Sequence, residues 1–287
     1  MAVSVSVCIP TYEQTKFLKR TLDSVFSQTF TDYEVIVSDD SKSDKVKKFI
    51  ESNYGDKKIA YHQNKPSLGS PANWDAAIKR ARGTYIKILH HDDWFSGPNS
   101  LGAFVTALDT NPSVDFVFSG LTVEDAKTGK RRRHRARDED IAALRKNPNT
   151  VFFSNFVGPP SSTMYRRSLN IHYDQHLVWA VDIAFYIDVL NHSPQFVYLP
   201  EALMTTTNNA GHQITNEFIN NKIEIKEYVY LFRKVPKSWR DMRRFFHFFL
   251  NRFRHYDIRS LKDLEKCDVT QPPWLVRAAL MRHRMEA

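Results

Sequence analysis

The chain has 287 residues, of which 42% are hydrophobic and 25% are charged, a composition typical of globular proteins. It contains no apolar stretch of the ~18 residues that a membrane-spanning helix needs, and its first residues lack a secretory signal pattern. Two cysteines, Cys8 and Cys267, are too few for a disulfide framework or a zinc site. We therefore expect a protein of the reducing cytoplasm.

The net charge of +9 is unevenly distributed. Residues 221–287 hold 16 Lys or Arg against 8 Asp or Glu, a balance of +8, whereas residues 1–220 hold 25 against 24, a balance of +1. A basic patch of this kind is one signature of nucleic-acid binding. Because the excess is confined to the tail, we expect no nucleic-acid partner.

Strand-like and helix-like segments alternate through the first 120 residues. Runs of β-branched residues predict strands, and apolar residues at helical spacing predict helices. The predicted strands are 3–9 (ended by Pro10), 33–38, 59–62, 84–89 and 114–119, and the predicted helices are 15–28, 43–53, 71–82 and 98–109. Such alternation predicts an α/β fold, a mostly parallel, Rossmann-like sheet with helices on both faces.

The pattern is looser after residue 120. The charged segment 124–149 is expected to be an exposed excursion. The remaining predicted strands are 151–156, 161–165 and 195–199, and the remaining predicted helices are 181–190, 216–234 and 239–256. We expect a catalytic domain over 1–220, with halves of about 1–120 and 121–220, and a helical C-terminal extension over 221–287.

Polar clusters follow three of the predicted strands, and ligands of parallel sheets bind at the carboxyl ends of strands. The clusters are Thr11-Tyr12, Asp39-Asp40-Ser41 and His90-His91-Asp92-Asp93. The last cluster suits a divalent cation held together with phosphate oxygens, or a polar turn. The acids of the second cluster suit hydrogen bonds to a nucleoside, or a cap on the next helix.

The ordered motifs 9–12 (IPTY), 35–41 (VIVSDDS) and 85–93 (YIKILHHDD), with Asn73-Trp74 between the last two, resemble family 2 glycosyltransferases of the GT-A fold. The resemblance covers roughly residues 3–220. It implies a nucleotide-sugar pocket, with Asp39 on the base. The implied pocket residues are Pro10, Thr11, Tyr12, Asp39, Asp40, Ser41, Asn73, His91 and Asp92.

The resemblance also implies a bound Mn²⁺ or Mg²⁺ on Asp92, the last acid of the family's Asp-x-Asp signature. His90 stands in place of the first acid, which in the family reaches the ribose or metal-bound water. His90 and His91 can equally be packing residues. Asp93, Trp94, Trp179 and Gln213 are further expected contacts to donor or acceptor.

Asp182 is the candidate catalytic base. The segment 179–182 (WAVD) is similar to the family segment that ends in the catalytic Asp at the start of a helix. Transfer with inversion needs a base for the acceptor hydroxyl, and a helix N-terminus favours the carboxylate anion. The alternative is that Asp182 only complements the helix dipole.

His212, before Gln213, is a candidate metal or diphosphate contact, or an exposed loop residue. The family's Gln-x-x-Arg-Trp motif of processive synthases is absent, which favours transfer of a single sugar. The arginine run 131–137 suits a phosphate-gripping flap or a solvated loop. Residues 239–256 form a basic, aromatic-rich amphipathic pattern, which suits an anionic membrane surface, the catalytic domain or a second subunit.

These expectations combine into a metal-dependent, inverting hexosyltransferase of surface polysaccharide biosynthesis (capsule or lipopolysaccharide). Its donor is a nucleotide-diphosphate sugar, UDP in preference to GDP or dTDP, and its acceptor is a glycan or lipid-linked glycan. We expect it in the cytoplasm, with peripheral attachment to the inner face of the membrane and a homodimer as further options. The alternatives are a non-catalytic glycan- or nucleotide-binding relative and a nucleotidyltransferase, although the loop after the first strand lacks the glycines that grip a triphosphate.

Overall fold

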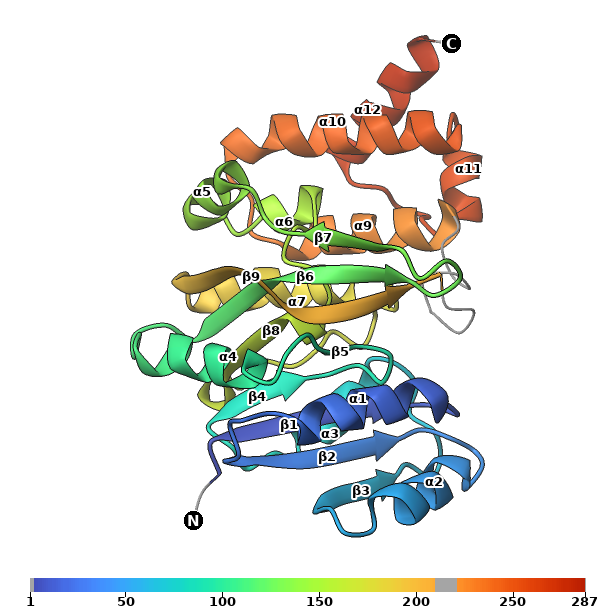
Figure 1. The fold of residues 1–287 in the computed structure, drawn as a ribbon. Coiled ribbons are helices and arrows are strands. Elements are labelled where there is room, and N and C mark those ends of the chain that lie inside the picture. Colours follow the sequence, from blue (N-terminus) through green and yellow to red (C-terminus); the bar gives the residue numbers. More distant parts are fainter. Residues whose placement is uncertain (1–2, 210–220, 287) are drawn as a thin grey trace.

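The computed structural model describes residues 3–209 and 221–286, in which one sheet is flanked by helices on both faces (Figure 1). The strands run in the order β3-β2-β1-β4-β8-β6-β9-β5, and β7 pairs with β6. Strands β3, β2, β1 and β4 are parallel, and β8 is antiparallel to both of its neighbours. The strands are β1 (Val5–Thr11), β2 (Tyr33–Asp39), β3 (Ile59–Gln63), β4 (Tyr85–Ile88), β5 (Trp94–Phe95), β6 (Phe116–Asp125), β7 (Arg131–His134), β8 (Thr163–Arg166) and β9 (Phe196–Asn208).

Two apolar cores hold the helices against the sheet. One core packs α1, α2 and α4 on one face, and the other packs α3, α6, α7 and the C-terminal helices on the opposite face. The predicted α/β architecture is confirmed. The α-helices are α1 (Lys16–Phe26), α2 (Lys45–Tyr54), α3 (Ala72–Ile78), α4 (Ser100–Asp109), α5 (Asp138–Lys146), α6 (Thr150–Phe153), α7 (Val181–His192), α9 (Asn221–Lys234), α10 (Trp239–Tyr256), α11 (Leu261–Lys266) and α12 (Trp274–Met285).

Strand β1 continues through Pro10 to Thr11, so the prediction that Pro10 ends it is wrong. Beyond Cys8, β1 pairs only with β2, because β4 ends at Ile88. The nitrogen of Pro10, which carries no hydrogen, faces the side beyond the end of β4. Its lack of an N–H therefore removes no hydrogen bond between strands. The strand thereby carries Thr11 to the edge of the sheet.

Two further predictions are corrected beyond residue 120. The segment 151–156 is not a strand: its first residues form the short helix α6, because Phe152 packs against the rings of Tyr228 and Phe245 at 5.1 and 4.8 Å. The charged segment 124–149 is less irregular than expected, since it contains β7, hairpin-paired with β6, and helix α5.

The aromatic face of α10 is buried inside the molecule. Phe245, Phe249 and Phe253 have no exposed surface, and they belong to the same core as α7 and the sheet. Burial decides between the alternatives for 239–256: this face packs on the catalytic region, and it is not available to a membrane. The C-terminal helices are therefore a further layer on the main core (Figure 1).

Candidate active site

The polar clusters after β1, β2 and β4 meet at one edge of the sheet. Thr11 is paired with Asp39, and the N–H of Asp40 donates to the carbonyl of Thr11 at 3.0 Å. A cavity of about 730 Å³ lies there. Its lining includes Pro10, Trp74, His90, His91, Asp92, Asp93, Arg132, Asn155, Trp179, Asp182, Thr206, Asn208, Tyr228 and Arg252.

Asp39 and Asp40 do not cap the next helix. The carboxylate of Asp39 accepts from the Ser41 hydroxyl at 2.5 Å and from the Tyr61 hydroxyl at 2.7 Å. Asp40 accepts from the backbone N–H groups of Leu68 and Gly69 at 2.9 and 2.6 Å. Both acids are buried, and they tie the end of β2 to β3 and to the loop that precedes α3.

Asn73 joins this network to the end of β1. Its side chain accepts from Asn64 at 2.9 Å and donates to the carbonyl of Thr11 at 3.3 Å. The Thr11 hydroxyl oxygen is buried with no hydrogen-bond partner among the described residues, and Tyr12 is half exposed. The predicted nucleoside residues are thus neighbours. Of them, Pro10 lines the cavity itself.

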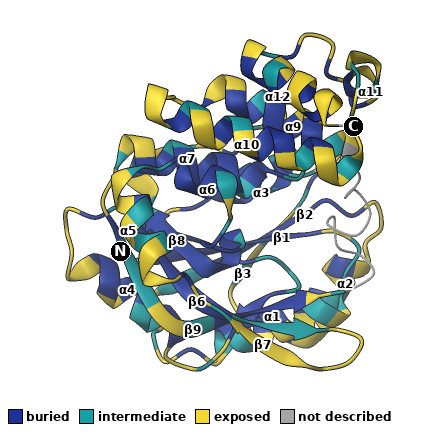
Figure 2. Ribbon diagram, turned by 90° about the horizontal axis from the view of Figure 1, so that it is seen from above, coloured by how far each residue is buried: buried dark blue, intermediate teal, exposed yellow. Residues whose placement is uncertain are grey.

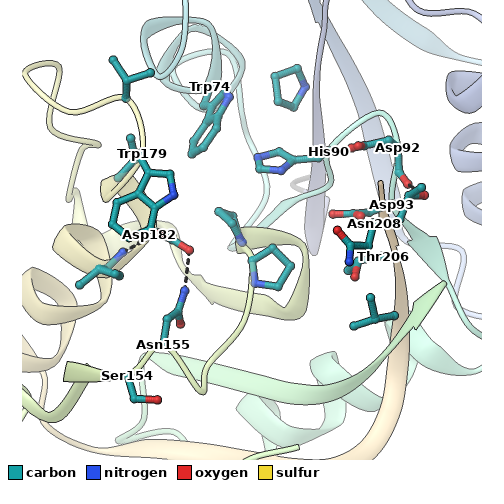
Figure 3. Close-up of a pocket in the computed structure, with 18 of the residues that line it drawn as sticks. Trp74, His90, Asp92, Asp93, Ser154, Asn155, Trp179, Asp182, Thr206 and Asn208 are labelled. Carbon is teal, nitrogen blue, oxygen red and sulfur yellow. Dashed lines mark hydrogen bonds between the residues drawn. The ribbon is translucent and has the colours of Figure 1, made fainter. Parts of the chain in front are cut away.

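The loop 90–93 is held from two sides. The Thr21 hydroxyl of α1 donates to the carbonyls of His91 and Asp93, both at 2.8 Å, and the Thr207 hydroxyl of β9 donates to the carbonyl of Asp92 at 2.7 Å. Asp93 is buried, and its burial and the charge of Asp92 raise the pKa of its carboxyl well above the ordinary value. Asp92 and Asp93 lie on one side of the cavity (Figure 3).

His90 projects toward the middle of the cavity, between Asp92 and Asp182 (Figure 3). Its ring lies 4.5 Å from that of Trp74, and its Nε2 has no hydrogen-bond partner among the described residues. Burial lowers the pKa of His90 to about 4, so its imidazole is neutral at physiological pH. Trp94 instead packs in the sheet under the guanidinium of Arg20, 3.4 Å from the ring, outside the cavity lining.

Asp182 lies in the first turn of α7, on the opposite side of the cavity (Figure 3). Its carboxylate accepts from the Asn155 amide at 2.7 Å and from the backbone N–H of Ile183 at 2.8 Å. Burial outweighs these two hydrogen bonds and raises the pKa of Asp182 to about 6. The group is an anion at neutral pH and a stronger base than an exposed aspartate.

Two neighbours position Asp182. Asn155 follows α6, and its side-chain amide oxygen (Oδ1) accepts from the N–H of Gly158 at 3.1 Å. Gly158 has a φ of +93°, which favours glycine, and a Cβ there would lie 2.7 Å from Leu121. Glu227 of α9 accepts from the N–H groups of residues 178–180 at 2.7–2.9 Å, and so fixes the segment that leads into α7.

Aromatic side chains form the wall beside Asp182. Trp179 packs edge-on against Tyr228 at 5.4 Å. Arg252 of α10 also lines the cavity, with its Nε 2.8 Å from Glu224. Sequence reasoning missed Asn155, Tyr228 and Arg252, because each reaches the cavity from a segment with no motif of its own.

The arginine run divides between two environments. Arg131 pairs with Glu124 at 2.7 Å on the exposed hairpin, whereas Arg132, paired with Val123 of β6, lines the cavity. A single arginine of the run can therefore reach a ligand in the cavity.

His212 and Gln213 lie outside the described residues, so their predicted roles stay predictions. Within 3–209 and 221–286, no group of three His, Cys, Asp or Glu side chains is arranged to hold a metal ion. A cation at Asp92 would need other ligands, such as phosphate oxygens. Across the same residues, no helix is both long and apolar enough to cross a bilayer.

The comparisons with known proteins agree with this geometry. A family model described as glycosyl transferase family 2 matches residues 6–174. An uncharacterized glycosyltransferase of Methanocaldococcus jannaschii is 26% identical over 246 residues, which are 84% of this chain and 81% of that protein.

Solved structures share the fold. S. aureus TarS, crystallised in complex with UDP-GlcNAc, is 17% identical with a TM-score of 0.69 and covers 98% of this chain and 89% of its own. The mannosyltransferase PcManGT from Pyrobaculum calidifontis, in complex with GDP-Man and Mn²⁺, is 15% identical with a TM-score of 0.59, covering 97% and 73%. These likenesses confirm the predicted GT-A architecture.

Proposed function

Because this chain belongs to glycosyl transferase family 2, we propose that it transfers a hexose from a nucleotide-diphosphate donor to a hydroxyl of a glycan or lipid-linked glycan, with inversion at the anomeric carbon. The observation that carries the proposal is the position of Asp182. It is a partly buried carboxylate at the start of α7, with a pKa raised by desolvation, and it faces the same cavity as Asp92.

The side of the cavity with Asp92 would hold the donor diphosphate. The Asp92 carboxylate fits a divalent cation such as Mn²⁺ or Mg²⁺, which takes one or two protein carboxylates and completes its shell with phosphate oxygens. When bound, such a cation neutralises the charge of the departing diphosphate. Arg132, on β7, also lines the cavity and would pair with the diphosphate.

Asp182 acts on the acceptor. The acceptor hydroxyl oxygen forms a bond to the anomeric carbon as the bond from that carbon to the diphosphate oxygen breaks, and the hydroxyl proton passes to Asp182. One displacement inverts the configuration. Trp179 and Tyr228, beside Asp182, supply apolar faces on which a sugar ring can pack.

We place UDP-sugars first among donors, because TarS, similar over nearly the whole chain, was crystallised with UDP-GlcNAc. GDP-sugars come second, since the mannosyltransferase was crystallised with GDP-Man. His90, neutral and with a buried Nε2, would meet the donor where the family has an acid. The bound donor would thus face one carboxylate fewer.

The test is a panel of UDP-, GDP- and dTDP-sugars incubated with the full chain and Mn²⁺, with release of nucleoside diphosphate as the readout. We expect slow hydrolysis of one donor, its loss with EDTA and its recovery with added Mn²⁺. The variant Asp92→Asn should lose donor turnover. Donor binding without any turnover, with or without candidate acceptors, would instead identify a non-catalytic relative.

A further inference from the structure

Helix α12 carries a second apolar face that nothing in the described structure covers. Trp274, Met281 and Met285 are 70%, 60% and 80% exposed. Met281 and Met285 follow Trp274 by seven and eleven residues, so all three share one side of a helix with 3.6 residues per turn. We call these three residues the α12 stripe. Large apolar side chains at such exposure mark an interaction surface when they are aligned.

The opposite side of α12 is already buried, so the stripe cannot turn inward. Leu275, Val276, Ala279 and Leu280 pack into the core shared with α10. Helix α12 is the outermost element of the C-terminal layer, and the outward sides of that layer are exposed (Figures 1 and 2). The stripe is therefore a fixed, convex ridge that faces away from the sheet.

Arginines border the ridge on both sides. By helical position, Arg277 and Arg284 lie along one flank of the stripe and Arg282 lies along the other. Among the described residues 269–286, Glu286 is the only acid. It pairs with Arg282 at 3.0 Å and with Arg254 at 2.6 Å. Arg277 and Arg284 have no acidic partner among the described residues, so the ridge carries excess positive charge.

We propose that the α12 stripe and its flanking arginines dock the protein on an anionic membrane surface. Tryptophan and methionine enter the interface between headgroups and acyl chains, and the arginines meet lipid phosphates. A lipid surface adapts to a convex ridge, whereas a folded partner must offer a matching groove. Three side chains on one helix are also too few for the about 800 Å² per partner that a stable dimer buries.

This surface is distinct from the aromatic face of α10, which is buried in the core. It is also separate from the cavity, because α9 and α10, which supply Tyr228 and Arg252 to the cavity wall, lie in the layer beneath α12 (Figure 1). Docking through α12 would hold the cavity one helix layer from the bilayer. The inference does not depend on the reaction at Asp182.

The test is sedimentation of the full chain with vesicles of phosphatidylcholine alone and of phosphatidylcholine mixed with phosphatidylglycerol. We expect binding only to the mixed vesicles, weakened by salt. Replacing all three stripe residues by serine should reduce binding at least about tenfold. The pair Arg277→Gln and Arg284→Gln should reduce it about 25-fold, or about fivefold for each arginine.

The matched control is Trp239→Ser. Trp239 is 80% exposed, but it begins α10 and is not part of the α12 stripe. Its loss should therefore leave vesicle binding unchanged. Equal loss with this control, or no binding to mixed vesicles by the folded wild-type chain, overturns the proposal. A dimer in sedimentation velocity that the serine variants dissociate would also overturn it, in favour of a second copy as the occupant.

Discussion

The end of β2 and the cavity wall at α7 use the same residue, aspartate, in opposite ways. At the end of β2, Asp39 and Asp40 are buried outside the cavity lining and receive hydrogen bonds from seven donor groups, three of which are backbone N–H groups. At the start of α7, Asp182 is partly exposed and receives two, one from Asn155 and one from Ile183. The hydrogen bonds to Asp39 and Asp40 hold the neighbouring loops in place. Asp182 has fewer hydrogen bonds to offset its desolvation, so its protonated form is favoured more than that of an exposed aspartate.

The strongest test of this contrast is Asp182→Asn. We expect transfer to fall by about 10³-fold or more, because the acceptor hydroxyl loses its base. Donor binding, measured by calorimetry with the nucleoside diphosphate and Mn²⁺, should be unchanged. The control is Asp188→Asn on the same helix, whose acid pairs with Lys234 at 2.8 Å on the surface. Near-normal transfer by the Asp182 variant would contradict a catalytic role.

The variant Asp40→Ala tests the bracing side. It leaves the N–H groups of Leu68 and Gly69 and the hydroxyl of Ser67 without their acceptor, so we expect a loss of about 3 kcal/mol in the free energy of unfolding. Urea denaturation measures the loss. Asp182→Asn should change stability far less, and equal destabilisation by the two variants would remove the contrast.

Wild-type activity should rise with pH, reach half of its plateau near pH 6 and level off about one pH unit higher, because Asp182 must be ionised to accept a proton. Asn155→Ala removes a hydrogen bond to that anion, so the pKa of Asp182 should rise by about one pH unit, and the rising limb should move with it. The measurement is kcat/KM against pH. A uniform loss of activity without movement of the limb would assign Asn155 a structural role only.

Glu227→Gln should move the same limb in the other direction, and by less. The negative charge of Glu227 makes a small contribution to the raised pKa of Asp182, after the larger effect of desolvation. Its removal should lower that pKa, so activity should begin at lower pH. Opposite shifts for Asn155→Ala and Glu227→Gln would confirm that the local environment sets the base, and shifts of one sign would not.

Much of the sheet edge could be predicted from the sequence. Strand–helix alternation is local, and it placed Thr11, Asp39 and Asp92 at the ends of β1, β2 and β4, where the structure has them. The prediction that β1 ends at Pro10 was wrong, because whether a strand tolerates proline at that position depends on where the neighbouring strand β4 ends. The run 151–156 misled because its phenylalanines pack against α9 and α10, which lie about 75 residues or more further along the chain.

The sequence by itself therefore determined the fold class, the family and the acids that gather at one edge, because these depend on local pattern and ordered motifs. Only the tertiary structure decided what each acid does. The side chains that position Asp182 come from the segment after α6 and from α9, and desolvation by the surrounding protein raises its pKa. The same holds for the tail: its charge is legible in the sequence, but long-range packing buried the aromatic face of α10 and left the stripe of α12 exposed.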